Sequence, residues 1–182
     1  MIYWYGARGV FNLSHGLESW EKYKQWILLP QLVDLISLDY NLNEDLIALK
    51  SYYIQDCEVN DNGTYTGLYT SLEFVIDEMK NDILYNLLTV VKNPQFECNS
   101  INLSDFEFIG YDILDSNYHY SILTNCGGFY EIYSPTDINK FGLIDDYDKA
   151  VKINKLFNIK IISDHNEDSN LFAIWRHRTL GR

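Results

Sequence analysis

The spacing of apolar residues near the start of the chain predicts one strand followed by two helices. Residues Met1–Tyr5 are aromatic and β-favouring, which is typical of a strand. After Ser14 the apolar residues recur at helical spacing. Pro30 ends this pattern and suits the first turn of a second helix, which should end near Asp39. The inward positions of the two helices are predicted to be Leu17, Trp20, Ile27 and Leu28, and then Leu32, Leu35 and Ile36.

The following segment is expected to be extended and to turn back on itself. Residues Ile47–Cys57 have the character of a strand, and Asn62-Gly63 is a strong signal for a tight hairpin turn. The chain should return as a second strand through residues Thr64–Thr66.

A long amphipathic helix is predicted to begin at Thr70. The spacing of Thr70 and Glu73 is that of a capping box, in which both side chains satisfy backbone N–H groups of the first turn. The pattern is compatible with a break near Asn81-Asp82 and stops at Pro94, which gives a helix of about four to six turns. Its apolar positions are Leu72, Val75, Ile76, Met79, Ile83 and Leu87.

The second half of the chain favours strands bounded by turns, with two helices between them. Ser134, Pro135 and Asp137 have the pattern of a helix start, and Gly142 should close that short helix. Asp145-Asp146 should open another. The inward positions of this last helix are predicted to be Ala150, Val151, Ile153, Leu156 and Phe157. The predicted strands are Phe106–Leu114, Tyr118–Thr124, Phe129–Tyr133, Ile159–Ile162 and Leu171–His177.

This succession of elements predicts an α+β fold. Helices and strands interleave, but the strands pair as hairpins, which favours antiparallel pairing over a doubly wound parallel sheet. We expect one globular domain over residues 1–182, in which antiparallel hairpins pack with about five helices. Its N-terminal half, 1–94, should be rich in helix and its C-terminal half, 100–182, rich in strand.

The charge of the chain changes the picture, because it is strongly acidic and unevenly distributed. The 182 residues include 26 acids and 14 bases, a formal net charge of −12, with 47% apolar and 15% aromatic residues. Such a field disfavours nucleic acid and suits a basic protein partner. The segment Asp34–Asp82 alone holds eleven acids against Lys50 and Lys80, a formal charge of −9. Arg176, Arg178 and Arg182 are too few to bind nucleic acid, and are expected to pair internally with the acidic half.

Within the acidic segment, two predicted elements form a candidate partner-binding surface. The solvent side of the long helix carries three acids, and three more flank the hairpin turn. Tyrosines are interleaved with these acids at Tyr52, Tyr53, Tyr65 and Tyr69, and could supply rigid contact area. The opposing interpretation is a solvated acidic face that serves solubility alone. The candidate residues are Asp56, Glu58, Asp61, Tyr65, Glu73, Asp77 and Glu78.

The distribution of cysteine and apolar residues predicts a cytoplasmic protein. No stretch approaches the ~20 apolar residues that span a bilayer, and the first residues lack the pattern of a signal peptide. Cys57, Cys98 and Cys126 are widely spaced and odd in number, which favours free thiols in a reducing compartment. We expect no cofactor and no metal: the histidines lack ligand spacing, and the polar residues 164–168 lack the spacing of a calcium loop.

An enzymatic alternative depends on Cys126. Gly127-Gly128 follows it and could leave backbone N–H groups free for an oxyanion, with His119 or His165 as the base. Turn chemistry explains the same glycines, and no catalytic residue is assigned. Asp112 and Asp115 do not form a catalytic carboxylate pair, since residues three apart on a strand point to opposite faces unless a bulge intervenes.

Four short motifs in the second half resemble those of bacterial immunity proteins. The motifs are Gly110-Tyr111-Asp112, Leu123–Phe129, Gly142-Leu143 and Ala173–Arg176. Immunity proteins are small acidic cytoplasmic proteins that neutralise the toxin domains of contact-dependent inhibition and other polymorphic toxin systems. The resemblance covers roughly 75 residues of turn and core positions, so it concerns fold more than site. It implies a non-enzymatic inhibitor without shared catalytic residues.

Three hypotheses follow from the sequence. The first is an immunity protein that binds a toxin domain, a basic nuclease being the expected type, through its acidic and tyrosine-rich surface. The second is a small cytosolic enzyme or ligand-binding domain that uses Cys126 with a histidine. The third is a structural or oligomeric domain whose charge serves solubility.

Overall fold

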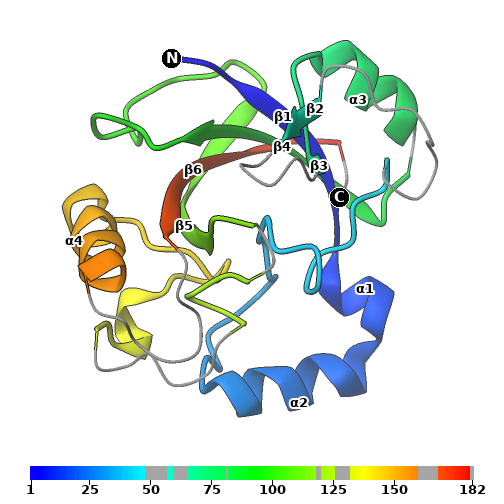
Figure 1. The fold of residues 1–182 in the computed structure, drawn as a ribbon. Helices are drawn as coiled ribbons and strands as arrows, with labels where there is room; N and C mark the ends of the chain where they lie inside the picture. Colours follow the sequence, from blue (N-terminus) through cyan, green and yellow to red (C-terminus); the bar gives the residue numbers. More distant parts are fainter. Residues whose placement is uncertain are drawn as a thin grey trace.

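A computed structural model gives the fold of the chain and describes residues 1–47, 57–59, 65–80, 82–117, 120–125, 132–159 and 168–180. Figure 1 shows an antiparallel sheet with helices around it, which confirms the α+β class. The helices are α1 (Phe11–His15), α2 (Leu17–Ile27), α3 (Leu72–Met79), the 3-10 turn η2 (Pro135–Asp137) and α4 (Tyr147–Ile159). The strands are β1 (Trp4–Gly9), β2 (Cys57–Val59), β3 (Tyr65–Tyr69), β4 (Tyr85–Lys92), β5 (Phe106–Asp115) and β6 (Ser169–His177).

The sheet joins strands that are far apart in the sequence. The six described strands lie in the order β2-β3-β1-β4-β6-β5, and every neighbouring pair is antiparallel. Only β2 and β3 are joined by a short connection, so the expectation that the strands pair mainly as local hairpins is wrong. Four of the strands come from the first half of the chain, which was expected to be mostly helical.

Both faces of the sheet are covered, because side chains of the central strand β4 alternate between two apolar cores. Leu87 and Val91 belong to the first core, whereas Leu88 and Val90 belong to the second. Helices α3 and α4 close the first core over opposite ends of the sheet, α3 over β1 and β4, and α4 over β5 and β6 (Figure 1). The irregular segments 29–47 and 138–144 close the second core through Ile36, Leu38, Phe141 and Leu143.

The predicted long helix is much shorter in the structure. Helix α3 ends at Met79, where Lys80 takes a left-handed φ of 53°, and strand β4 begins at Tyr85. Its cap is Ser71 rather than Thr70: the Ser71 hydroxyl accepts a hydrogen bond from the Phe74 N–H at 3.2 Å. The prediction failed because a strand buried on both faces has a continuous apolar run, which extends a helical pattern as readily as a strand pattern.

The predicted helix after Pro30 is absent from the described structure. Its backbone pairs at long range instead, since the Val33 and Ile36 N–H groups donate to the carbonyls of Lys140 and Phe141 at 2.9 and 3.0 Å. Polar side chains within the segment also compete with helical bonding. The Asp34 carboxylate accepts from the Leu35 N–H at 2.8 Å, and the Asp39 carboxylate accepts from the Asn41 N–H at 2.8 Å.

The remaining predictions for the second half have mixed outcomes. Strands β5 and β6 and helix α4 confirm three of the predicted elements, and Ser134 with Asp137 forms a capping box on η2. The predicted strand at 118–124 is wrong for the described residues 120–124, which form one bridge, Leu114 to Ser121, followed by a turn. Ile159 belongs to α4 rather than to a strand. Most of the predicted strands at 129–133 and 159–162, and the Asn62-Gly63 turn, lie outside the described residues.

Gly110 allows a close approach between β5 and the turn that follows η2. It lies at a bulge with φ +134°, and an added Cβ would be 2.8 Å from the Leu143 Cβ. Gly110→Ala is therefore expected to lower the free energy of unfolding by about 1–3 kcal/mol, measured by urea denaturation. Gly16→Ala is the matched control, because Gly16 has φ +79° but nothing within 4 Å of its added Cβ. An equal loss in both variants would show that the close approach contributes nothing.

Candidate functional site

The acidic residues of α3 lie on the side of the helix away from the sheet. Val75 and Met79 are buried in the first core, whereas Glu73 and Asp77 are exposed and Glu78 is half-buried. In the described part of the chain, no lysine or arginine lies within ion-pair distance of Glu73 or Asp77. Two carboxylates separated by one helical turn therefore face the solvent with no cation from the described residues beside them.

A tyrosine from β1 lies next to this acidic helix. Tyr5 is half-buried and pairs across the sheet with Tyr69, three residues before α3 begins. Burial raises the pKa of Tyr5, and the negative charge of the nearby Glu73 raises it further. Sequence reasoning placed Tyr5 in a strand but did not connect it to the acids, because the pairing of β1 with β3 is a long-range contact. Glu73, Asp77 and Tyr5 together are called the α3 surface below.

The other tyrosines and acids of the predicted surface are placed differently. Tyr69 is 1% exposed and packs against Phe74 with ring centroids 5.4 Å apart, so it cannot serve as an exposed anchor. Glu58 lies in β2, and Tyr65 begins β3 and pairs with Val59. The side chains of Glu58 and Tyr65 are outside what the structure describes. The remaining predicted residues, Asp56 and Asp61 with Tyr52 and Tyr53, lie outside the described residues.

Part of the acidic segment Asp34–Asp82 is interior rather than surface. Asp34, Asp39 and Asp45 are 9%, 0% and 6% exposed. Burial raises the pKa values of Asp34 and Asp39, against the lowering effect of the hydrogen bonds that they accept. The carboxylate of Asp45 forms an ion pair at 3.1 Å with Arg8, a side chain that is itself 1% exposed.

Two hollows of the described surface have different linings. The first, of about 450 Å³, is mainly apolar and is lined by Met1, Ile2, Trp4, Lys92, Pro94 and Phe96, among others. The second, of about 710 Å³, is mainly polar and is lined by Glu107, Asn139, Lys140, Phe141, Asp145 and Arg176, among others.

The charge of Arg176 in the polar hollow is neutralised within the protein. Its guanidinium lies 2.7 Å from Glu107 and 3.9 Å from Asp34, and it stacks at 4.6 Å on the ring of Phe141. The closer partner, Glu107, belongs to the C-terminal half, and only the longer contact with Asp34 joins Arg176 to the acidic half, so the expected pairing is found in part.

The residues of the enzymatic alternative are largely outside the described structure. Cys126, His119 and His165 are not described, so the catalytic hypothesis stays a prediction.

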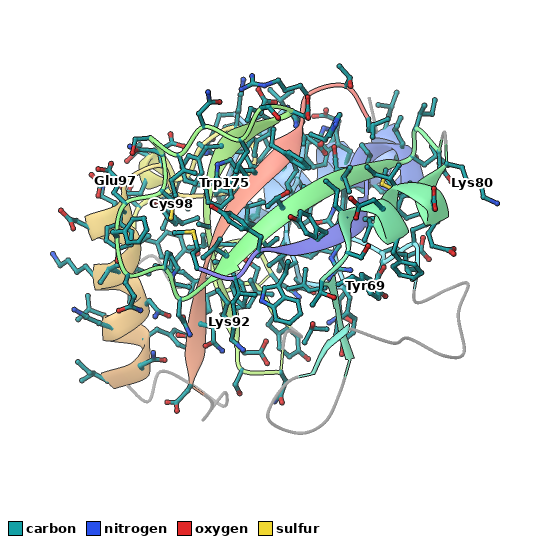
Figure 2. The ribbon with its side chains drawn as sticks, turned by 90° about the horizontal axis from the view of Figure 1, so that it is seen from above. Tyr69, Lys80, Lys92, Glu97, Cys98 and Trp175 are labelled. Carbon is teal, nitrogen blue, oxygen red and sulfur yellow. The ribbon has the colours of Figure 1, made fainter. Side chains whose placement is uncertain are left out.

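Cys98 is buried beside α4 near Trp175 (Figure 2), and burial raises the pKa of its thiol. His177 accepts hydrogen bonds at Nδ1 from the N–H groups of Thr179 and Leu180, at 3.2 and 3.0 Å. Among the described residues, no group of three or more His, Cys, Asp or Glu side chains could hold a metal ion.

Comparisons with known proteins give no family for this chain. No family model matches it, and neither the curated proteins nor the solved structures contain a significant match. In the parts of the chain that the structure describes, no helix is long and apolar enough to span a bilayer. The geometry of the α3 surface is therefore the basis for a functional proposal.

Proposed function

We propose that this chain is an immunity protein of the cytoplasm, which binds a basic toxin domain through the α3 surface and blocks it. The partner would be recognised by its lysines and arginines, and a nuclease fits because its groove binds phosphates and so is basic. Acidic side chains would take the place of the phosphates and accelerate association.

The observation that supports this proposal is a contrast between helices. On α2, Glu18 and Glu21 form ion pairs with Lys22 and Lys24 at 2.6 and 2.8 Å. On α3, the exposed Glu73 and Asp77 have no such partner in the described chain, and the following Lys80 points away from the body of the protein (Figure 2). Like charges left unpaired on one face destabilise the free protein slightly, and a basic partner would relieve this repulsion.

Tyr5 would give the acidic face an amphipathic contact. Its half-buried ring adds apolar area beside Glu73, and its phenol can donate a hydrogen bond to a partner. Interfaces of this kind depend on a few aromatic or arginine side chains surrounded by polar residues. The combination of an aromatic ring with acidic side chains supports binding of a protein rather than of a simple cation.

The experiment is charge reversal on α3, tested against the toxin domain that we expect to be encoded beside this chain. Glu73→Lys with Asp77→Lys is expected to lower the association rate constant by at least about tenfold at low salt and to flatten its dependence on ionic strength. Stopped-flow fluorescence measures both quantities, and circular dichroism checks that the variant is folded. Protection of cells against the toxin should fall in parallel.

A matched control is available on the opposite end of the sheet. Asp148→Lys makes the same kind of charge change in the first turn of α4 as Glu73→Lys makes in the first turn of α3. We expect the association rate constant of this control to stay within about threefold of the wild-type value, as for a charge outside the interface. If the α3 variant keeps its rate and its protection, or if the control loses as much, the α3 surface is not the interface.

A further inference from the structure

Four polar side chains form a fully buried cluster on the second face of the sheet. Ser37 and Asp39 come from the irregular segment 29–47, Asp112 from β5, and Ser121 from the segment 120–125. Their exposed fractions are 1%, 0%, 0% and 0%. Segment 29–47 therefore meets two stretches that are far from it in sequence, at two carboxylates and two hydroxyls.

Hydrogen bonds connect these four residues into a closed ring. The Ser37 hydroxyl donates to Asp112 Oδ2 at 2.7 Å, and the Ser121 hydroxyl donates to Asp112 Oδ1 at 2.7 Å. The Ser121 N–H donates to Asp39 Oδ2 at 2.9 Å, and the Asp39 N–H donates to the Ser37 hydroxyl oxygen at 3.1 Å. The ring fastens segments 29–47 and 120–125 to β5 and to each other.

Neutral donors occupy the other positions around the two carboxylates. Asp112 also accepts from the N–H groups of Ile113 and Leu38, and Asp39 from the Asn41 N–H and the Asn125 side-chain amide. In the described chain, neither carboxylate has a lysine, arginine or histidine within ion-pair distance. Two buried acids that share serines and lack a cation are strongly disfavoured in their doubly ionised form.

Among the residues that the structure describes, the titratable groups around the ring are tyrosines and a further carboxylate, and none of them adds a positive charge. Tyr23 of α2 faces both carboxylates and donates to the Thr124 carbonyl at 2.6 Å. Tyr133 donates to the Ile122 carbonyl at 3.0 Å, and Tyr40 with Asp115 lies on the side of Asp39. Burial and the nearby carboxylates raise the pKa values of Tyr23 and Tyr40, so these phenols stay neutral at ordinary pH.

We propose that the Ser37–Asp39–Asp112–Ser121 ring is a proton-operated latch, in which uptake of one proton tightens the attachment of segments 29–47 and 120–125 to β5. Loss of that proton leaves both buried carboxylates ionised and loosens the same segments. The latch is a property of the fold and is independent of the proposed partner.

The direction of the effect follows from proton linkage. Burial raises the pKa of Asp112 to about 6 and also raises that of Asp39, whereas the opened segments would expose ordinary carboxyls. The closed ring therefore binds a proton that the open state releases, and closure becomes more favourable as pH falls from about 7 to about 5, by at most about tenfold per pH unit. The usual carboxylate effect, in which acid loosens a structure, is reversed here.

Carboxyl titration by carbon NMR and amide hydrogen exchange on the wild-type chain test the latch directly. We expect an aspartate of the ring to titrate near pH ~6, well above the ~3.9 of a free aspartate. The protection factors of the Leu38, Asp39 and Ser121 amides, corrected for intrinsic exchange, should rise as pH falls from ~7 to ~5. If both carboxyls titrate in the ordinary range, or the protection factors stay constant, the latch does not exist.

Substitution of one carboxylate separates proton uptake from mere hydrogen bonding. Asp112→Asn imitates the protonated side chain, so its ring amides should be protected at every pH and lose their pH dependence. Asp148→Asn removes an exposed carboxylate of α4 and should keep the wild-type profile. Asp39→Asn replaces the first variant if that variant does not fold. A variant of either ring aspartate that folds and retains the full pH dependence would overturn the proposal.

Discussion

Replacing Arg8 by leucine is expected to lower the free energy of unfolding by about 3–5 kcal/mol. Arg8 is 1% exposed; its guanidinium lies 3.1 Å from the Asp45 carboxylate and donates to the Thr66 carbonyl at 2.8 Å. Leucine removes the cation but leaves Asp45 buried, so a charge remains in the interior with no counter-charge from the described residues beside it and only the Ile47 N–H donating to it at 2.9 Å. The loss in unfolding free energy reflects the buried carboxylate of Asp45 without its cation more than the strength of the ion pair itself.

The double variant Arg8→Leu with Asp45→Leu distinguishes these two contributions. It removes both charges and should recover a substantial part of the stability that the single variant loses. Urea denaturation of the wild type, both single variants and the double variant completes the cycle. Lys22→Leu is the control, because its pair with Glu18 is exposed to solvent and should contribute little. A double variant no more stable than Arg8→Leu would show that the buried charge is not the cause.

Trp175→Ala is the second substitution with a large expected effect, a loss of about 3–5 kcal/mol in the free energy of unfolding. Trp175 lies in β6 with no exposed surface, and its ring packs edge-on against Tyr3 and Phe108 at centroid distances of 6.3 and 5.3 Å. Its indole N–H donates to the Ile101 carbonyl at 3.4 Å. Alanine would leave a cavity in the first core that the rigid sheet beneath cannot fill by collapse.

A second tryptophan supplies the control for this experiment. Trp26 lies in α2 and is 58% exposed, so Trp26→Ala removes the same atoms from a site that is largely hydrated already. Its change in unfolding free energy should be under about 1 kcal/mol. Guanidinium denaturation followed by circular dichroism avoids any dependence on the tryptophan signal. Equal losses in the two variants would contradict the assignment of Trp175 to a tightly packed core.

The elements that sequence reasoning predicted well are those with local signals. Ser134 and Asp137 cap η2 within four residues, and Asp146 caps α4 by accepting from the Lys149 N–H at 2.8 Å. Strands β5 and β6 are continuous runs of β-favouring residues, so they can be recognised without knowing which strands pair with them. Strand β4 was missed because its burial on both faces depends on which elements cover it, and no pattern within its own residues records that.

The candidate site shows the same difference between features with local signals and features that depend on long-range contacts. The exposure of Glu73 and Asp77 follows from helical periodicity, which a sequence displays directly. The burial of Asp39 and Asp45 does not, because their partners Ser121 and Arg8 are far away along the chain. A count of charges cannot distinguish exposed acids from buried ones, and in the structure long-range contacts hold some of these acids in the interior.

The order of the strands in the sheet also has a consequence for folding speed. Strand β5 pairs within the sheet only with β6, and β1 pairs with β4, so residues 116–168 and 10–84 respectively must be ordered or looped out before these ladders can close. Loop closure costs entropy before any contact compensates for it, and chains dominated by such distant pairings fold in roughly milliseconds to seconds. Until β1 and β6 have paired with it, the apolar central strand β4 has both edges unpaired. Refolding yield should therefore depend on protein concentration, with aggregation through β4 competing with the arrival of β6.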